Sequence, residues 1–233
     1  MNSKDNVTNQ KKQKNKKRRN PFRFFFFDFV KVTGALYASL WLRPKRLYES
    51  KKAKKHIRGS AIVIANHPSF IDPVAMIFAF WYRRVHIMAT QDMFRNKIGN
   101  WFFRRVLCIP VNKNDLSINT FRSAMEVLGD GGVLGIFPEG TVNDDASTLK
   151  SFKSGVVLMA LKGHAPIVPV YLVPPKKWYN RVVMVIGNPI NLEEMYEGTP
   201  NLRIIEEVSV KLRDKEFELM EIYEKWKTRK SSK

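Results

Sequence analysis

The sequence of 233 residues contains a single cysteine, Cys108. One thiol excludes an internal disulfide and any metal site built from several thiolates. The chain also lacks the G-x-S-x-G turn that presents a nucleophilic serine in α/β-hydrolases. Its glycine-rich stretch, residues 129–135, precedes an apolar run instead of following one, so we interpret it as a turn and not as a phosphate-binding loop.

Acidic residues are scarce in the first quarter of the chain. Residues 1–59 hold 18 Lys and Arg against 3 acids, which accounts for +15 of the formal charge of +20; residues 60–233 hold the other 23 against 18. A concentrated basic segment indicates an anionic partner, which can be a nucleic acid, a membrane surface or a phosphate-bearing substrate. Residues 1–20 also have almost no apolar side chains, and we predict that they form a disordered basic tail.

No long apolar run is free of charges. Residues 24–42, FFFFDFVKVTGALYASLWL, would form a helix of about 28 Å, slightly shorter than a bilayer core of about 30 Å. Asp28 and Lys31 interrupt it and fall on one side, so we predict an amphipathic helix that lies in the membrane interface. The residues expected to contact lipid are Phe24, Phe25, Phe26 and Trp41. The alternatives are a helix packed on the protein's own core and a membrane span in which Asp28 and Lys31 pair.

Beyond a basic linker at residues 43–58, apolar runs of strand length alternate with helical patterns. Strands are expected at residues 60–65, 85–89, 106–111, 133–137, 166–172 and 182–186. Helices are expected at residues 73–82, 91–105, 117–128, 153–162 and 202–227. This alternation predicts a layered α/β domain with a mostly parallel sheet flanked by helices.

The segment AIVIANHPSFIDP, residues 61–73, places His67 at the end of an expected strand, where functional groups of such sheets gather. Pro68 and Ser69 interrupt a regular helix, so the His67 ring can fold back onto Asp72. The carboxylate would then hold one ring N–H and leave the other nitrogen free to accept a proton. The alternative is that Asp72 and Pro73 only cap and begin a helix.

Three further segments carry signals of a turn, of a helix start or of a positive charge at a strand end. Residues 137–141, FPEGT, follow a strand, and Gly140 permits a tight turn. Residues 152–155 open a helix whose N-terminus can attract an anion. The stretch CIPVNK, residues 108–113, brings Lys113 to another strand end.

The segments NHPSFID, IPVNK, FPEGT and PIVPV occur in the order and approximate spacing of the four blocks of the glycerolipid acyltransferases. The chain most resembles the 1-acylglycerol-3-phosphate (lysophosphatidate) acyltransferases, over residues 60–188. The resemblance implies that an acyl group moves from a thioester to the sn-2 hydroxyl of lysophosphatidate, giving phosphatidate in phospholipid synthesis. His67 would be the general base and Asp72 its orienting partner. The residues implied in acceptor binding are Lys113, Glu139, Gly140, Thr141 and Lys153.

Two positions depart from the family pattern. Lys113 and Val142 stand where the family usually has arginine. Lysine supplies a point charge where arginine would grip a phosphate with two prongs. Glycerol 3-phosphate or another lysolipid therefore stays open as the acceptor, and Arg104 or Arg105 can share the phosphate.

The resemblance also implies the partners. A thioester is already activated, so no metal or cofactor is expected, and the donor is acyl-coenzyme A or an acyl carrier protein. The expected division is a tail at residues 1–20, a membrane-associating helix and linker at 21–59, and an acyltransferase domain at 60–233, on the cytoplasmic face of a membrane. A nucleic-acid partner is not expected, because the charge lies in a tail without a recognition motif. A non-catalytic basic protein that docks on membranes or binds nucleic acid remains the alternative from another class.

Overall fold

The computed structural model of the chain describes residues 24–41, 44–112, 117–143, 149–173, 181–196 and 200–231. The expected tail at residues 1–20 lies outside them, as does Lys113. The strands are β1 (Lys45–Tyr48), β2 (Ala61–Ala65), β3 (Val85–Thr90), β4 (Ile109–Val111), β5 (Val133–Ile136), β6 (Ile167–Val173) and β7 (Val183–Ile186). The helices are α2 (Phe25–Trp41), α3 (Asp72–Ala79), α4 (Lys97–Arg105), α5 (Ile118–Gly129), α6 (Gly155–Gly163) and α7 (Leu202–Ser231), with short 3₁₀ turns η2 (Gln91–Phe94) and η3 (Leu192–Glu194).

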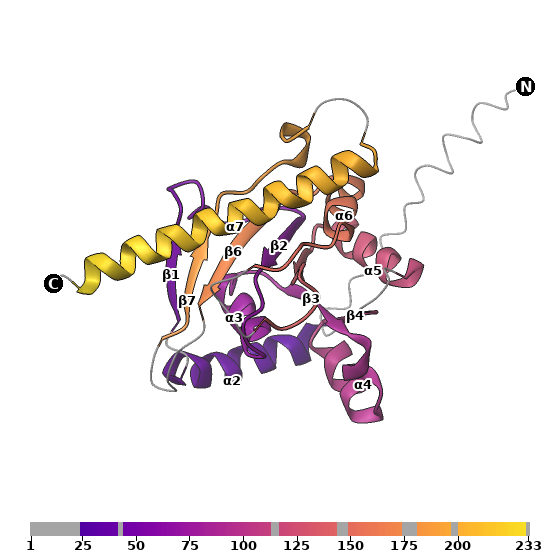
Figure 1. Cartoon of the computed structure of the whole chain (residues 1–233). Coiled ribbons are helices and arrows are strands. Elements are labelled where there is room, and N and C mark those ends of the chain that lie inside the picture. The colour runs from indigo at the N-terminus through magenta and orange to yellow at the C-terminus, as the bar shows by residue number, and fades with distance from the viewer. Residues whose placement is uncertain are drawn as a thin grey trace, which may run out of the picture.

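The described strands form one sheet in the order β1-β7-β6-β2-β5-β3-β4 (Figure 1). Every pairing is parallel except that of β6 with β7. The predicted α/β class with a mostly parallel sheet is therefore confirmed. Strand β2 lies between β5 and β6, and all five of its residues are buried, as expected for a central strand covered on both faces.

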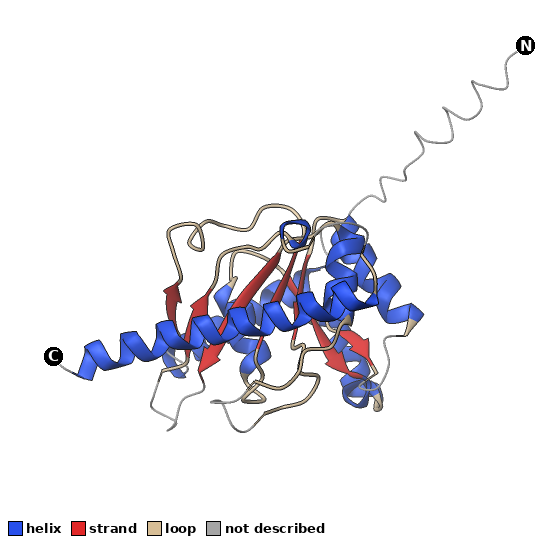
Figure 2. Ribbon diagram, turned by 45° about the horizontal axis from the view of Figure 1, so that its top comes forward, coloured by secondary structure: helices blue, strands red, loops and turns tan. Residues whose placement is uncertain are grey.

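The side chains of β2 alternate between two cores, because successive residues of a strand point to opposite faces of the sheet. Ala61, Val63 and Ala65 join a core that includes the buried apolar residues of α3. Ile62 and Ile64 join a core with residues of α5, α6 and α7. Figure 2 shows α7 running across the sheet from one edge toward the other.

Three segments differ from the sequence-based expectation. Part of the expected linker forms β1, whose short sequence KRLY carries no apolar run but pairs with β7 as a basic edge strand, and charges are usual at edges. The expected helix 91–105 is divided, because Asn96 adopts an extended backbone and its side chain caps α4. The expected strand 106–111 begins only at Ile109, after Leu107 takes a left-handed backbone conformation (φ 65°).

Helix α2 packs on the domain through its polar side. The Asp28 carboxylate accepts two hydrogen bonds from the Arg84 guanidinium, at 3.0 and 2.7 Å. Lys31 Nζ donates to the Trp81 carbonyl at 3.0 Å, and Phe27 is buried. The large apolar residues recorded as exposed on α2 are Phe25, Phe29, Val32 and Leu40. Their spacing places them on one side of the helix, so α2 turns its polar side inward and an apolar side outward.

The residues expected to contact lipid occupy different positions on this helix. Phe25 points outward, Phe24 lies 4.6 Å from the Arg84 guanidinium, and Phe26 packs against α4. The side chain of Trp41 lies outside the described part of the chain. Among the helices that the structure describes, none combines the length and the apolarity that crossing a bilayer requires.

Helix α7 buries one carboxyl group in the core. Glu216 is 0% exposed, and within the described chain neither of its carboxyl oxygens has a well-formed hydrogen bond. Burial raises the pKa of Glu216 well above its ordinary range, and the charge of the Glu139 carboxyl raises it further. The backbone N–H of Asn66 lowers the pKa of Glu216 and so opposes this shift. Because Asn66 follows β2 and Glu139 follows β5, the Glu216 carboxyl lies near the ends of these two strands.

Glu216→Gln tests whether this carboxyl is protonated in the folded chain. A carboxyl with a raised pKa binds its proton more tightly when folded, so folding loses free energy as pH rises above about 4.3, the ordinary pKa of glutamate, until pH reaches the folded pKa. Glutamine does not ionise. We expect the free energy of unfolding of Glu216→Gln, measured with urea, to rise relative to the natural chain between pH 4 and 8.

The matched control is Glu206→Gln, which changes an exposed glutamate of the same helix and is expected to show a far smaller trend. If the free energy of unfolding of Glu216→Gln instead falls relative to that of the natural chain as pH rises, Glu216 is ionised in the folded chain and stabilised by a partner.

Candidate active site

Asn66 fixes the end of β2. It is buried, its Nδ2 donates to the Leu172 carbonyl at 3.0 Å, and its Oδ1 accepts from the Leu172 backbone N–H at 2.7 Å. The amide therefore satisfies both backbone groups of a residue on β6, as another strand would. The chain can leave the sheet directly afterwards without stranding buried polar groups, and His67 is the first residue beyond this anchor.

His67 and Asp72 are joined as the sequence predicts. His67 Nδ1 lies 2.9 Å from Asp72 Oδ2, and the same oxygen accepts a hydrogen bond from the Ser69 backbone N–H at 2.6 Å. Asp72 is the first residue of α3, and no side chain caps that helix from the preceding position. The carboxylate thus turns back toward the histidine instead of only capping α3, and Ser69 serves the turn.

The two side chains differ in burial. Asp72 is 1% exposed and the His67 side chain 16%. Burial raises the pKa of Asp72, while the hydrogen bonds from His67 and Ser69 act against the shift. The His67 ring stacks on Phe137 with centroids 4.2 Å apart. Among the described residues its Nε2 has no hydrogen-bond partner, so this nitrogen is left for an incoming group.

The FPEGT turn holds the backbone of His67. The Asn143 backbone N–H donates to the His67 carbonyl at 2.7 Å. The buried Glu139 carboxylate accepts from the backbone N–H groups of Lys150, at 3.4 Å, and of His67, and from the Asn143 side chain. Burial raises the pKa of Glu139, and these donors oppose the rise. Both backbone polar groups of His67 are therefore held by residues at or near the end of β5.

Gly140 and Lys153 lie against each other. Gly140 has a left-handed backbone (φ 71°), and a Cβ there would come within 2.7 Å of Lys153 Cε and 2.9 Å of its Nζ. Lys153 also donates its backbone N–H to the Pro138 carbonyl at 3.0 Å. The left-handed backbone favours glycine at this position, and the end of the Lys153 side chain lies over it, which brings a lysine ammonium group to the FPEGT turn.

Thr141 is exposed and bonded to a second lysine. Lys150 Nζ donates to Thr141 Oγ1 at 3.2 Å and to the Val142 carbonyl at 3.0 Å. Lys113 lies outside the described residues. Arg104 and Arg105 lie on α4, where Arg104 bonds Asn100 and Arg105 covers the Trp101 ring, and no described contact joins them to the residues around His67.

Sequence reasoning missed Asn143, Lys150 and Glu216. Asn143 and Lys150 flank residues 144–148, and nothing in their local sequence shows that they fold back onto His67 and Glu139. Glu216 stands in a helix rich in charged residues, where its burial cannot be read from residue type. The buried face of that helix, with Val208, Leu212 and Leu219 at spacings of four and seven, includes position 216 and is the signal that could have identified it.

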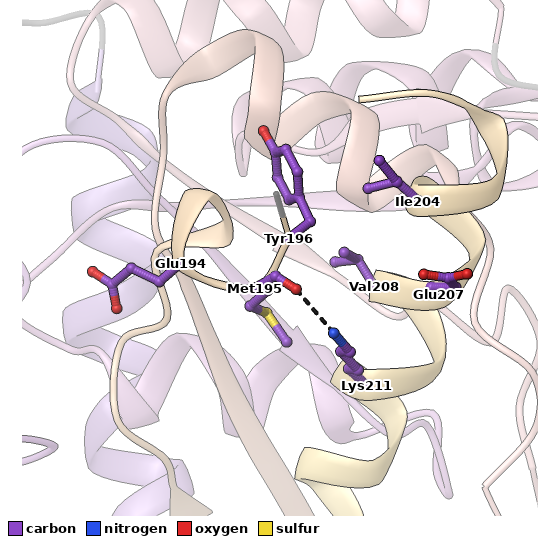
Figure 3. A pocket seen from close by; sticks show the side chains of 7 residues that line it. All are labelled: Glu194, Met195, Tyr196, Ile204, Glu207, Val208 and Lys211. Atoms are coloured by element: carbon purple, nitrogen blue, oxygen red, sulfur yellow. Dashed lines mark hydrogen bonds between the residues drawn. The ribbon is translucent and has the colours of Figure 1, made fainter. Parts of the chain in front are cut away.

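A separate pocket lies between η3 and the start of α7 (Figure 3). Its volume is about 410 Å³, and Lys211 Nζ donates across it to the Met195 carbonyl at 2.9 Å. The lining residues are Glu194, Met195, Tyr196, Ile204, Glu207, Val208 and Lys211. None of the residues predicted for the site lines it. Cys108 is a further bystander, because burial raises its pKa to about 12 and leaves a poor nucleophile.

The arrangement around His67 can perform base catalysis on a neutral nucleophile. An imidazole whose Nδ1–H is held by a carboxylate presents Nε2 as a proton acceptor. Two ammonium groups, of Lys150 and Lys153, accompany the FPEGT turn and can attract an anionic substrate. The described residues thus combine a proton acceptor with cations at the carboxyl ends of two neighbouring parallel strands, β2 and β5.

Known proteins resemble this chain in sequence and in fold. It is 25% identical over 135 residues to the 1-acyl-sn-glycerol-3-phosphate acyltransferase of Bacillus subtilis, covering 56% of this chain and 66% of that protein. It is 30% identical over 147 residues to the enzyme of the same name from Borreliella burgdorferi, covering 62% and 58%. The chain thus spans between half and two thirds of the length of these relatives.

The fold resembles the crystal structure of the 1-acyl-sn-glycerophosphate (LPA) acyltransferase PlsC from Thermotoga maritima. The TM-score is 0.61 at 21% sequence identity, covering 93% of this chain and 86% of that one. A family profile described as "Acyltransferase" matches residues 45–173, which is more than half of the chain and contains the His67–Asp72 pair and the FPEGT turn. The chain therefore belongs to the acyltransferase family.

Proposed function

We propose that the protein transfers an acyl group from an acyl thioester to the sn-2 hydroxyl of 1-acylglycerol 3-phosphate and so makes phosphatidate for phospholipid synthesis. The observation that carries the proposal is the 2.9 Å contact between His67 Nδ1 and Asp72 Oδ2, which leaves Nε2 as the proton acceptor. The names of the relatives from Bacillus subtilis and Borreliella burgdorferi support the same acceptor.

In the proposed reaction, His67 Nε2 accepts the proton of the sn-2 hydroxyl as the oxygen attacks the thioester carbonyl carbon. Asp72 stabilises the imidazolium that forms and keeps the ring oriented. The tetrahedral oxyanion collapses, the carbon–sulfur bond breaks, and the imidazolium returns its proton to the thiolate. The products are the ester and the free thiol of coenzyme A or of an acyl carrier protein, and His67 is neutral again.

The acceptor phosphate is proposed to lie by the FPEGT turn. Lys153, held against Gly140, and Lys150, bonded to Thr141, supply positive charge there, and we propose that Lys113 adds to it. Glu139 is buried and bonded to the His67 backbone, so we propose that it positions His67 rather than contacting the acceptor. Lysines without a paired arginine grip neutralise a phosphate with less geometric selectivity, which keeps glycerol 3-phosphate as a second candidate acceptor.

His67→Ala tests the proton acceptor. A positioned general base contributes about 10²–10⁴-fold to rate, so we expect kcat to fall by that factor, with Asp72→Asn falling less because the imidazole remains. The measurement is the formation of labelled phosphatidate in detergent micelles from lysophosphatidate and either acyl-coenzyme A or acyl-loaded acyl carrier protein. Glycerol 3-phosphate and lysophosphatidylcholine are parallel acceptors.

The matched control is His164→Asn. This histidine is 82% exposed and has a left-handed backbone (φ 44°), which asparagine tolerates, and full activity is expected. Product formation by His67→Ala at the natural rate would refute the base assignment. Absence of product from the natural chain with every acceptor and donor would favour a non-catalytic docking or nucleic-acid-binding protein.

We also propose that α2 associates with a membrane surface through its outward apolar side. The polar residues Asp28 and Lys31 are bonded to Arg84 and to the Trp81 carbonyl of the domain. The polar side of α2 therefore faces the domain, and the apolar side is the one left exposed. Four exposed apolar residues along 17 residues of helix are better placed in the boundary between head groups and acyl chains. The surrounding excess of Lys and Arg favours an anionic leaflet by about 1 kcal/mol for each charge near it.

Phe25→Ser with Phe29→Ser tests this contact. Both side chains are exposed, so the fold should be unaffected while the apolar area available to lipid falls. We expect the fraction of protein that co-sediments with vesicles containing phosphatidylglycerol to drop at least tenfold. Val210→Ser, an exposed position on α7, is the control, and equal sedimentation of the double variant and the natural chain would show that α2 does not contact lipid.

A further inference from the structure

Helix α4 is anomalous for an element of a folded domain, because none of its nine residues is buried. Ile98 is 81% exposed, and Trp101 and Phe102 are also exposed. Their spacing of three and four residues places the three on one side of the helix. A helix in water normally turns such a side toward a core, and α4 turns it away from the core.

Positive charge accompanies this side. Residues 95–105 contain Arg95, Lys97, Arg104 and Arg105 and no acid. Lys97 and Arg104 are seven residues apart and share one edge of the helix. The Arg105 guanidinium lies 5.4 Å from the centroid of the Trp101 ring. Apolar and aromatic residues rimmed by cations fit the boundary of an anionic bilayer, where arginine and lysine heads reach phosphate while their stems lie along acyl chains.

Helix α4 is also fixed to the proposed membrane helix. The Phe26 ring of α2 packs edge-on against Trp101 and Phe102, with centroids 5.1 and 6.2 Å apart. Figure 1 shows α2, α3 and α4 at the same end of the molecule. The turn that carries His67 and leads into α3 exposes Phe70 at 86%. Apolar side chains are therefore exposed on α2, on α4 and in the His67 turn itself.

We propose that α4 is a second membrane-docking element, which inserts Ile98 and Trp101 into a bilayer containing anionic phospholipid. Together with α2 it gives the protein two contacts with the lipid surface. One helix alone would let the protein rotate about the helix axis, whereas two contacts fix the orientation of the domain on the membrane. The proposal extends the membrane contact proposed for α2 but does not rest on acyl transfer, and its test measures vesicle binding.

The first test is Ile98→Asp, with Leu202→Asp as the matched control. Leu202 is 80% exposed at the start of α7, whose buried residues pack on the opposite face of the sheet from α3. With vesicles of phosphatidylcholine and phosphatidylglycerol in equal amounts, we expect Ile98→Asp to weaken binding at least tenfold and Leu202→Asp to leave it unchanged.

The double variant Lys97→Gln with Arg104→Gln is expected to weaken binding roughly 25-fold, about fivefold for each charge, and to show a much smaller effect with pure phosphatidylcholine.

A second test locates the side chain directly. Ile98→Cys and Leu202→Cys are labelled with an environment-sensitive dye, and Cys108 reacts slowly because burial raises its pKa to about 12. A blue shift at position 98 and none at 202 on adding anionic vesicles is the expected result.

Equal vesicle binding by Ile98→Asp and the natural chain, or no shift at position 98, overturns the proposal. So does a vesicle-independent dimer that Ile98→Asp dissociates while vesicle binding stays intact, because the occupant would then be a second copy. Activity in detergent micelles is expected to be unchanged in Ile98→Asp and in Leu202→Asp, so loss of docking and loss of chemistry are told apart.

Discussion

The geometry of the site depends on how His67 is held at the end of a buried strand. Its carbonyl accepts from Asn143, its backbone N–H donates to Glu139, and its ring nitrogen Nδ1 is bonded to Asp72. Three residues from two segments, the turn after β5 and the start of α3, thus restrain one residue, and a restrained imidazole loses little freedom when a substrate binds. The Asn66 side chain, which occupies the backbone groups of Leu172, completes the support from the side of β6.

This arrangement follows from a parallel sheet in which β2 lies beside β5. Parallel neighbours end at the same edge, so the residues after Ala65 and after Ile136 meet although about 70 positions separate them in the chain. Helix α7 covers the face of the sheet opposite to α3 and brings the buried Glu216 close to the ends of β2 and β5. The buried carboxyl groups of Glu139 and Glu216 then act on each other. Because two like charges repel in a buried place, the protonated form of Glu216 is favoured.

Much of this could be predicted from the sequence, and the reasons for the failures are physical. Uninterrupted runs such as AIVIA predict buried strands, and the interval from His67 to Asp72, broken by Pro68, predicts a turn that returns the ring to the carboxylate. The short strand β1 was missed because its pairing with β7 comes from tertiary context and not from its basic residues. Asn143 and Lys150 were missed because their contacts depend on how two loops meet. The direction of α2 could not be predicted either, since polar residues on one side of a helix do not reveal whether that side faces water or Arg84.

The position of β2 in the sheet has a consequence for synthesis of the chain. Its neighbours β5 and β6 come about 70 and 105 residues later, and β1 waits for β7 near residue 183. A chain leaving the ribosome therefore presents the aromatic helix α2 long before the central strand has partners on either side. The proposed attachment of α2 to a lipid surface can therefore precede assembly of the site around His67, and folding would then finish on that surface rather than in free solution.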